Sequence, residues 1–280
     1  MHGTALTVAC NGGGLMALIG IFLAGVAFGE EEPTASDESA DLAQKLQNPV
    51  AALISVLFQN NFEWGAGQGS KGFRYLLNVQ PVIPISVSEN WNVISRTIVP
   101  IIHQTDTFGP TTQDGIGDIL QSLFLSPKAP GPGGIIWGAG PVFQFPSASD
   151  ELLGMGKFGL GPTAVVLRQA SGWTYGMLAN HVWSVAGDDD RVHVSQTFLQ
   201  PFLSYTTKTY TTFGIQTEST YDWTGTKWTV PLIAPVSQLL KIAGQPISLQ
   251  LAPKWYAEGP TGAPDWGIRF AVTLLFPKKR

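Results

Sequence analysis

Among the residue types that can do chemistry, one histidine lies close to a serine: His181 and Ser184 in the stretch NHVWS. A serine hydroxyl becomes a nucleophile when a histidine within hydrogen-bonding distance takes its proton. The surrounding alternation predicts a β-strand, whose successive side chains point to opposite faces, so a separation of three keeps these two residues apart. We therefore expect the protein not to be an enzyme, with a serine on another strand as the alternative partner for His181.

Three other stretches have residue types that bind ions or phosphate. The aspartates at 188–190 lie close to His193, but the oxygen-ligand spacing of a dedicated calcium loop is missing, so a solvated loop is the simpler interpretation. The glycine-rich stretches at 65–72 and 154–163 lack the strand, loop and helix order of a phosphate-binding cradle. We expect no metal site and no cofactor.

Charge is scarce in this chain. Of 280 residues, 13% are charged and 44% hydrophobic, whereas about a quarter of residues are charged in ordinary soluble domains. The net charge is -4 and the Lys and Arg residues are dispersed, which excludes a nucleic-acid partner because phosphate binding needs clustered cations. The single cysteine, Cys10, rules out an internal disulfide framework.

The N-terminus contains the longest weakly polar run, at 11–29, followed by three glutamates. It predicts a signal peptide over residues 1–29, cleaved after Ala27 or Gly29, each of which has a small residue at position -3. The segment before the run has His2 but no Lys or Arg, so an alternative start codon or a membrane anchor is the other interpretation.

The next segment, residues 30–49, predicts an acidic linker and then a short helix near residues 40–46, which Pro49 stops. From residue 50 to 280 the pattern changes: apolar residues alternate with a period of two, and no helical period appears. The expected strands are 53–64, 73–87, 91–104, 117–127, 135–146, 158–169, 173–186, 194–207, 211–223, 227–240, 246–257 and 266–276.

The connections between these strands alternate in length. Counted from the first, the odd ones are generally longer and rich in Gly, Asp and Thr, and most even ones are tight turns. Long loops on one side and short turns on the other are typical of an up-and-down outer-membrane barrel.

The last strand shows the two faces of such a barrel. Trp266, Ile268 and Phe270 begin an entirely apolar row, while Gly267 and Arg269 begin the other. Six expected strands keep every Asp, Glu, Lys and Arg off their apolar row. A charge facing lipid costs roughly 2–4 kcal/mol at mid-bilayer, so a membrane barrel predicts this exclusion, but a soluble β-sandwich predicts it too.

Tryptophan positions favour the membrane barrel over the sandwich, because interfacial girdles place the indole ring at the end of each strand. Six fall beside the expected long loops: Trp64, Trp183, Trp223, Trp228, Trp255 and Trp266. Three fall near the short turns: Trp91, Trp137 and Trp173. We predict an all-β fold: an up-and-down antiparallel transmembrane β-barrel of about 12 strands, with a short N-terminal periplasmic helix.

Two arginines fit this assignment poorly. Arg96 shares its row with Ile94 and Ile98, and Arg168 shares its row with Val166. Either a β-bulge shifts the register there, or these side chains reach the interface by snorkelling.

The polar rows would place seven charged residues in the lumen toward the long-loop end: Glu63, Arg74, Glu218, Asp222, Lys254, Glu258 and Arg269. Such a ring could be a constriction that filters permeants, or a set of ion pairs that stiffens a filled barrel. Twelve strands lie between filled barrels and open porins, so a narrow or plugged path is expected, with segment 39–49 as the candidate plug.

Four long stretches carry a resemblance to a known family: LAQKLQNPVAALISVLFQNNF at 42–62, YLLNVQPVIPISVSENWNVISRTIVPII at 75–102, GIGDILQSLFLSPKAP at 115–130 and WTYGMLANHVWSVAG at 173–187. They resemble a widespread bacterial outer-membrane "transporter" family named for the MetA pathway of phenol degradation and often mislabelled neuromedin U. The resemblance implies an outer-membrane barrel with a transport role and carries over no catalytic residues.

Together these observations predict an outer-membrane channel for small solutes, with aromatic or other apolar compounds suggested by the family label alone. The expected partners are outer-membrane lipid, the permeant, and the barrel-insertion machinery, because the alternating end at 267–276 is similar to an insertion signal. The alternatives are a structural or surface-binding barrel with a closed lumen, and a lipid-acting barrel enzyme.

Overall fold

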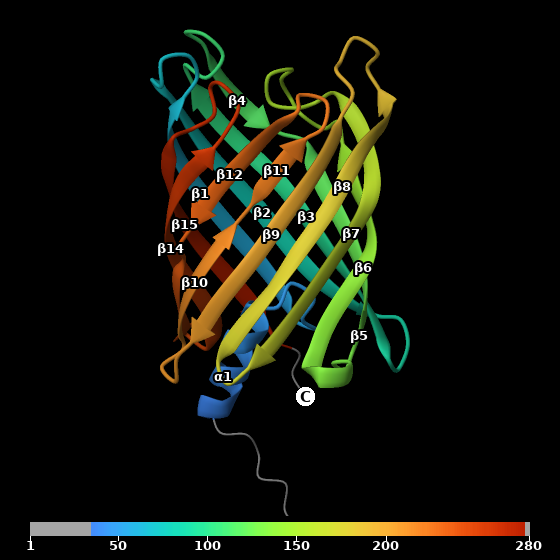
Figure 1. Cartoon of the computed structure of the whole chain (residues 1–280). Coiled ribbons are helices and arrows are strands. Elements are labelled where there is room, and N and C mark those ends of the chain that lie inside the picture. The colour runs from blue at the N-terminus through green and yellow to red at the C-terminus, as the bar shows by residue number, and fades with distance from the viewer. Residues whose placement is uncertain (1–34, 278–280) are drawn as a thin grey trace, which may run out of the picture. The chain divides into compact units, whose positions relative to one another are not determined.

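In the computed structural model of the protein, which describes residues 35–277, a single antiparallel sheet closes into a barrel (Figure 1). Closure is made by β1 (Ile54–Ala66), which pairs on one side with β2 (Gly72–Ser86) and on the other with β15 (Trp266–Phe276). The expected signal peptide and the first residues of the expected linker lie outside the described residues.

The remaining strands are β3 (Trp91–Thr105), β4 (Thr112–Ile116), β5 (Ile119–Pro127), β6 (Ile135–Phe145), β7 (Lys157–Ala170), β8 (Trp173–Gly187), β9 (Ser195–Thr206), β10 (Thr211–Thr217), β11 (Ser219–Asp222), β12 (Lys227–Ile233), β13 (Val236–Ile242) and β14 (Gln245–Glu258). They follow around the barrel in chain order except where two of them share one partner, at β4 and β5 and from β10 to β13. Every pairing is antiparallel. A single turn of 3-10 helix, η1 (Pro132–Gly134), precedes β6.

The expected count of about 12 strands is wrong, because the sheet contains 15. The difference comes from interruptions: β4 and β5 both pair with β3, β10 and β11 both pair with β9, and β12 and β13 both pair with β14. At the last break Pro235 has no N–H to give to the ladder, while the Ala234 N–H still donates to the Pro253 carbonyl at 3.2 Å.

The two ends of the barrel differ as the loop lengths predict. The long-loop end carries the connections 67–71, 106–111, 146–156, 188–194, 223–226 and 259–265. The short-turn end carries 87–90, 128–134, 171–172, 207–210 and 243–244, and the connection at 128–134 is the longest of these because it contains η1.

The barrel is apolar outside and mixed inside. On β15 the outward Phe270 is 41% exposed, whereas the neighbouring Arg269 points into the lumen and is 2% exposed. All nine tryptophans lie on outward rows, and some contact one another. Trp64 stacks on Trp266 of the neighbouring strand at 4.5 Å, and Trp91 of β3 meets Trp137 of β6 edge-on at 5.9 Å, with β5 between their strands. Their contact with lipid headgroups stays a prediction.

The two poorly fitting arginines lie on opposite faces of the barrel wall. Arg96 points into the lumen, where its Nη2 donates to the Gln80 Oε1 at 2.8 Å, so its apolar row is a luminal row. Arg168 is exposed on the outward row of β7, two residues from the strand end, where its long side chain can reach the interface.

A helix lies at the short-turn end of the barrel (Figure 1). This helix, α1 (Ala35–Leu46), begins about five residues before the expected position and ends where Pro49 predicts. Its Ala43 is 2% exposed and packs in an apolar cluster with Leu239 and Leu275 of the barrel wall. Within residues 35–277, no helix is long and apolar enough to cross a membrane.

A second apolar cluster fills part of the lumen just beyond α1. Val50, which follows the helix, packs there against Ile94, Phe124 and Leu178 from three different strands. Ile94 and Phe124 are fully buried, so this part of the lumen is closed by side chains rather than open to water.

These face assignments predict the effect of a single charge. We expect Phe270→Lys, in the middle of the outward row of β15, to destabilise the folded barrel by roughly 2–4 kcal/mol. Thr273→Lys, which points into the lumen, is the matched control and should destabilise it much less. Guanidinium unfolding in lipid vesicles measures both free energies, and equal losses would contradict a lipid-facing row.

Candidate functional site

A buried carboxylate, Glu63 on β1, is the centre of the luminal charge network. Glu63 is fully buried and accepts from groups on both sides of its strand. Its Oε2 lies 2.6 Å from the Arg74 Nη2 on β2, and its Oε1 lies 2.7 Å from the Lys254 Nζ on β14. The Tyr256 hydroxyl donates to the same Oε1 at 2.6 Å. Both oxygens are therefore satisfied by charged or hydroxyl donors.

The contact between β1 and β14 is possible because the strand between them has a glycine at this level. A Cβ at Gly267 of β15 would lie 2.6 Å from the Phe62 carbonyl oxygen and 3.2 Å from the Glu63 Cγ. Any larger residue would push on the backbone of β1. Gly267 thus leaves the space through which Lys254 reaches Glu63.

A second ion pair crosses the lumen next to the first. The guanidinium of Arg269 donates from Nη1 and Nη2 to the two oxygens of Glu218, each at 2.7 Å, and from Nε to the Asn61 Oδ1 at 2.8 Å. This two-point geometry holds Glu218, at the break between β10 and β11, against β15, from which it is separated in the sheet by β12, β13 and β14.

Of the seven residues expected in a luminal ring, the structure brings five together: Glu63, Arg74, Glu218, Lys254 and Arg269. The other two are not part of the network, which corrects the expectation. Asp222 accepts from the backbone N–H of Thr224 at 3.0 Å in a turn, and Glu258 is exposed at the end of β14. Both residues belong to luminal rows by alternation, but they lie too near the strand ends to reach the network.

Several members of the network are neutral residues that charge patterns do not reveal. Asn61 and Tyr256 bind the ionic groups directly. The alternation in the sequence could have predicted their luminal position, since Asn61 is on the same strand face as Glu63 and Tyr256 on the same face as Lys254. Gln59 links Asn78 and Gln80, whose amides both donate to its Oε1.

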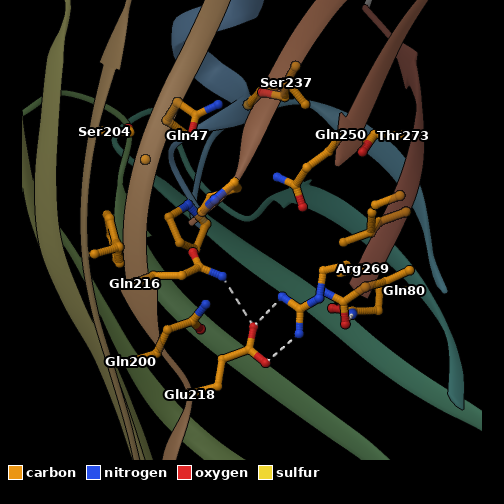
Figure 2. A pocket seen from close by; sticks show the side chains of 18 of the residues that line it. Gln47, Gln80, Gln200, Ser204, Gln216, Glu218, Ser237, Gln250, Arg269 and Thr273 are labelled. Carbon is orange, nitrogen blue, oxygen red and sulfur yellow. Dashed lines mark hydrogen bonds and ion pairs between the residues drawn. The ribbon is translucent and has the colours of Figure 1, made fainter. Parts of the chain in front are cut away.

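A cavity of about 330 Å³ lies between this network and α1 (Figure 2). Its floor includes Leu46 and Gln47 at the end of the helix, and the Glu218–Arg269 pair lies on its wall. Side-chain amides and hydroxyls are frequent around it: Gln59, Asn78, Gln80, Gln200, Ser204, Gln216, Ser237, Ser248 and Gln250.

A second cavity, of about 620 Å³, lies toward the long-loop end and shares Asn78 with the first. The loop 146–156 lines it with Leu152 and Leu153. Two charged residues hold this loop in place: the Asp118 Oδ2 accepts from the Met155 N–H at 2.6 Å, and Arg191 donates to the carbonyls of Glu151, at 2.7 Å, and Gly154.

The histidine and serine candidates lie apart from the lumen network. His181 and Ser184 are on opposite faces of β8, as predicted, and His181 points outward, 2.7 Å from the Thr197 Oγ1 and 3.4 Å from the Ser195 Oγ. Ser184 instead contacts the His193 Nδ1 at 3.3 Å. Within residues 35–277, no carboxylate hydrogen-bonds to either histidine, and no group of three or more His, Cys, Asp or Glu residues is placed to hold a metal ion.

Comparisons with known proteins support the fold. No protein-family model and no curated protein matches the sequence. Among solved structures, an outer membrane channel from Pseudomonas putida F1 is similar, with a TM-score of 0.62 and 13% identity over 80% of this chain and 94% of that chain. The beta domain of the Bordetella autotransporter Brka aligns over 80% of this chain and 100% of its own at 13% identity, with a TM-score of 0.45.

At this identity the likeness shows the fold alone. The closed antiparallel barrel, its apolar outward rows and its luminal charges define the chain as a β-barrel of the outer-membrane class. The more particular link to phenol degradation stays an expectation from the resemblance.

The network predicts a large effect at its centre. Glu63→Gln leaves Lys254, which is 8% exposed, without its counter-charge, and we expect a loss of about 3–5 kcal/mol in the free energy of unfolding. Glu258→Gln, on an exposed carboxylate, is the control and should change little. Adding Lys254→Gln to Glu63→Gln should recover part of the loss; a single Glu63→Gln variant as stable as the wild type would contradict the central role of this carboxylate.

Proposed function

We propose that the protein is a passive channel that carries small solutes across the outer membrane through its lumen. The observation that supports this most directly is the pair of cavities stacked along the lumen, which meet at Asn78. A barrel serving only as a scaffold has no need for adjoining cavities along its axis. The similar fold of an outer membrane channel agrees with this proposal.

The structure corresponds to a closed state of this channel. At the short-turn end α1 and the cluster around Val50 cover the first cavity, and at the long-loop end the loop 146–156 lines the second. Passage of a solute therefore requires α1 to move.

The luminal charges predict whether the proposed path prefers anions or cations. Around the first cavity and the Glu63 cluster, four cationic side chains face two carboxylates: Arg74, Arg96, Lys254 and Arg269 against Glu63 and Glu218. An excess of fixed positive charge lowers the energy of an anion in a narrow path and raises that of a cation. We infer that anions are preferred, and that the five residues brought together by the structure form the constriction.

A second candidate is a structural or surface-binding barrel with a permanently closed lumen. It is favoured by the completeness of the ion pairs and by the apolar cluster next to α1. The two candidates differ in conductance, which the next experiments measure. In either case we propose outer-membrane lipid and the barrel-insertion machinery as partners.

Removal of α1 tests the closed end. We expect deletion of residues 35–47 to raise the conductance of the protein in planar bilayers several-fold, because Leu46 and Gln47 close the first cavity. Gln169→Ala removes one hydrogen bond of 2.8 Å to the Gln44 carbonyl, so it should lengthen the time that the channel stays open. This effect should be smaller than that of the deletion. Silent recordings from a folded, heat-modifiable deletion variant would favour the permanently closed barrel.

Ion selectivity tests the network. In a salt gradient we expect the reversal potential of the wild type to show anion preference, Arg74→Ala to reduce that preference, and Glu218→Ala to increase it. Asp222→Asn is the control, because this carboxylate lies outside the network, and it should leave the potential unchanged. The same potential in all four proteins would show that ions do not pass these residues.

A further inference from the structure

One luminal arginine stands apart from the ion pairs. Arg96 lines the first cavity, and its only hydrogen bond in the described part of the chain is the one from Nη2 to the Gln80 Oε1. Within the same residues no Asp or Glu oxygen lies within 4.0 Å of its guanidinium nitrogens. Arg74 and Arg269, by contrast, each have a carboxylate partner.

The carboxylate on the wall of this cavity is already used. Both oxygens of Glu218 accept from Arg269 at 2.7 Å, and the Gln216 Nε2 also donates to one of them at 3.3 Å. Glu218 therefore has little capacity to accept from Arg96. Glu218 attracts Arg96 across the cavity without a hydrogen bond. Without reorganising the cavity, a carboxylate in direct contact with Arg96 therefore has to come from outside the chain.

Most of the guanidinium of Arg96 remains available to a ligand. An arginine carries five N–H donors in a planar fork, and a carboxylate accepts two of them at once. Among the described residues, no fully buried side-chain nitrogen or oxygen lacks a partner, so the unused donors of Arg96 are open to the cavity rather than sealed in the wall.

The rest of the cavity matches a solute with an apolar body. Ile98 follows Arg96 on the luminal row of β3, and Phe198 and Phe202 of β9 contribute aromatic rings to the same cavity. The amide and hydroxyl groups between them can bind further polar atoms. With a volume of about 330 Å³, the cavity is at the small end of the range for small-molecule sites.

We propose that this cavity is a binding site for a small organic acid, whose carboxylate pairs with Arg96 and whose apolar body packs on Ile98 and Phe198. The site rests on the proposed channel for its purpose, since it would be a stopping point on the path of the solute. Binding itself does not require conduction, which allows the two to be tested separately.

Calorimetric titration of the full-length protein in detergent tests this site with benzoate and with its neutral analogue benzamide. The wild type should bind benzoate and bind benzamide at least about tenfold more weakly, which is the loss expected for a charge-assisted hydrogen-bonded pair. Arg96→Gln should weaken benzoate binding by a similar factor, and Arg96→Lys should retain most of it. Arg168→Gln removes an arginine from the outward face and should have no effect.

A second variant tests the site while keeping the arginine. Gln80→Glu places a carboxylate where the Gln80 amide now accepts from Arg96 at 2.8 Å, so it should occupy the guanidinium and abolish benzoate binding. Heat-modifiable migration on a gel confirms that each variant is folded. Unchanged benzoate affinity in either Arg96→Gln or Gln80→Glu, equal affinity of the wild type for benzamide, or no benzoate binding by the wild type would overturn the proposal.

The planar-bilayer conductance of the variant that lacks residues 35–47 separates this result from the proposed function. Benzoate binding by the wild type without conductance in the deletion variant refutes the channel and leaves the Arg96 site standing. Conductance of the deletion variant without benzoate binding by the wild type refutes the site alone.

Discussion

The bond from Lys254 to Glu63 is the interaction on which the lumen depends. It joins the first strand of the barrel to the last but one, across Gly267, and Arg74 on the other side completes the neutralisation of the carboxylate. A buried carboxylate without such partners costs several kcal/mol, so the three side chains act as a unit. Glu63 and Arg74 already face each other within the β1–β2 hairpin, but Lys254 meets Glu63 only when β1 pairs with β15, so this bond stabilises the closed ring.

Around this network the lumen is divided into filled and open parts. The cluster of Val50, Ile94 and Phe124 closes one level with apolar packing, while amide side chains line the cavity beside it. Apolar packing excludes water and favours one arrangement, whereas amides keep their hydrogen bonds with either water or a solute. Apolar packing beside an amide-lined cavity suits a path that is closed at rest and can still bind a polar solute.

Arg96 shows how a luminal surface differs from a soluble core and from lipid. Its row contains Ile94 and Ile98, so by composition it resembles a lipid-facing row, yet it faces the cavity. The wall facing lipid must be apolar almost everywhere, but the wall facing the lumen is free to be apolar or polar. Parity rules are therefore reliable for excluding charges from lipid and weak for identifying the luminal face. Arg168, with the same kind of apolar neighbours, lies outside near a strand end.

The sequence by itself determined the all-β class, most strand boundaries, the outward position of all nine tryptophans, the opposite faces of His181 and Ser184, and the helix before Pro49. These follow from alternation and turn chemistry, which are local properties of the chain. Only the tertiary structure decided which charges meet, since Glu63 and Lys254 are 191 positions apart and their contact depends on strand register and ring closure. The same reason applies to the breaks in three strands, to the exclusion of Asp222 and Glu258 from the network, and to the open guanidinium of Arg96. Each depends on what faces a residue across the barrel, which no local pattern contains.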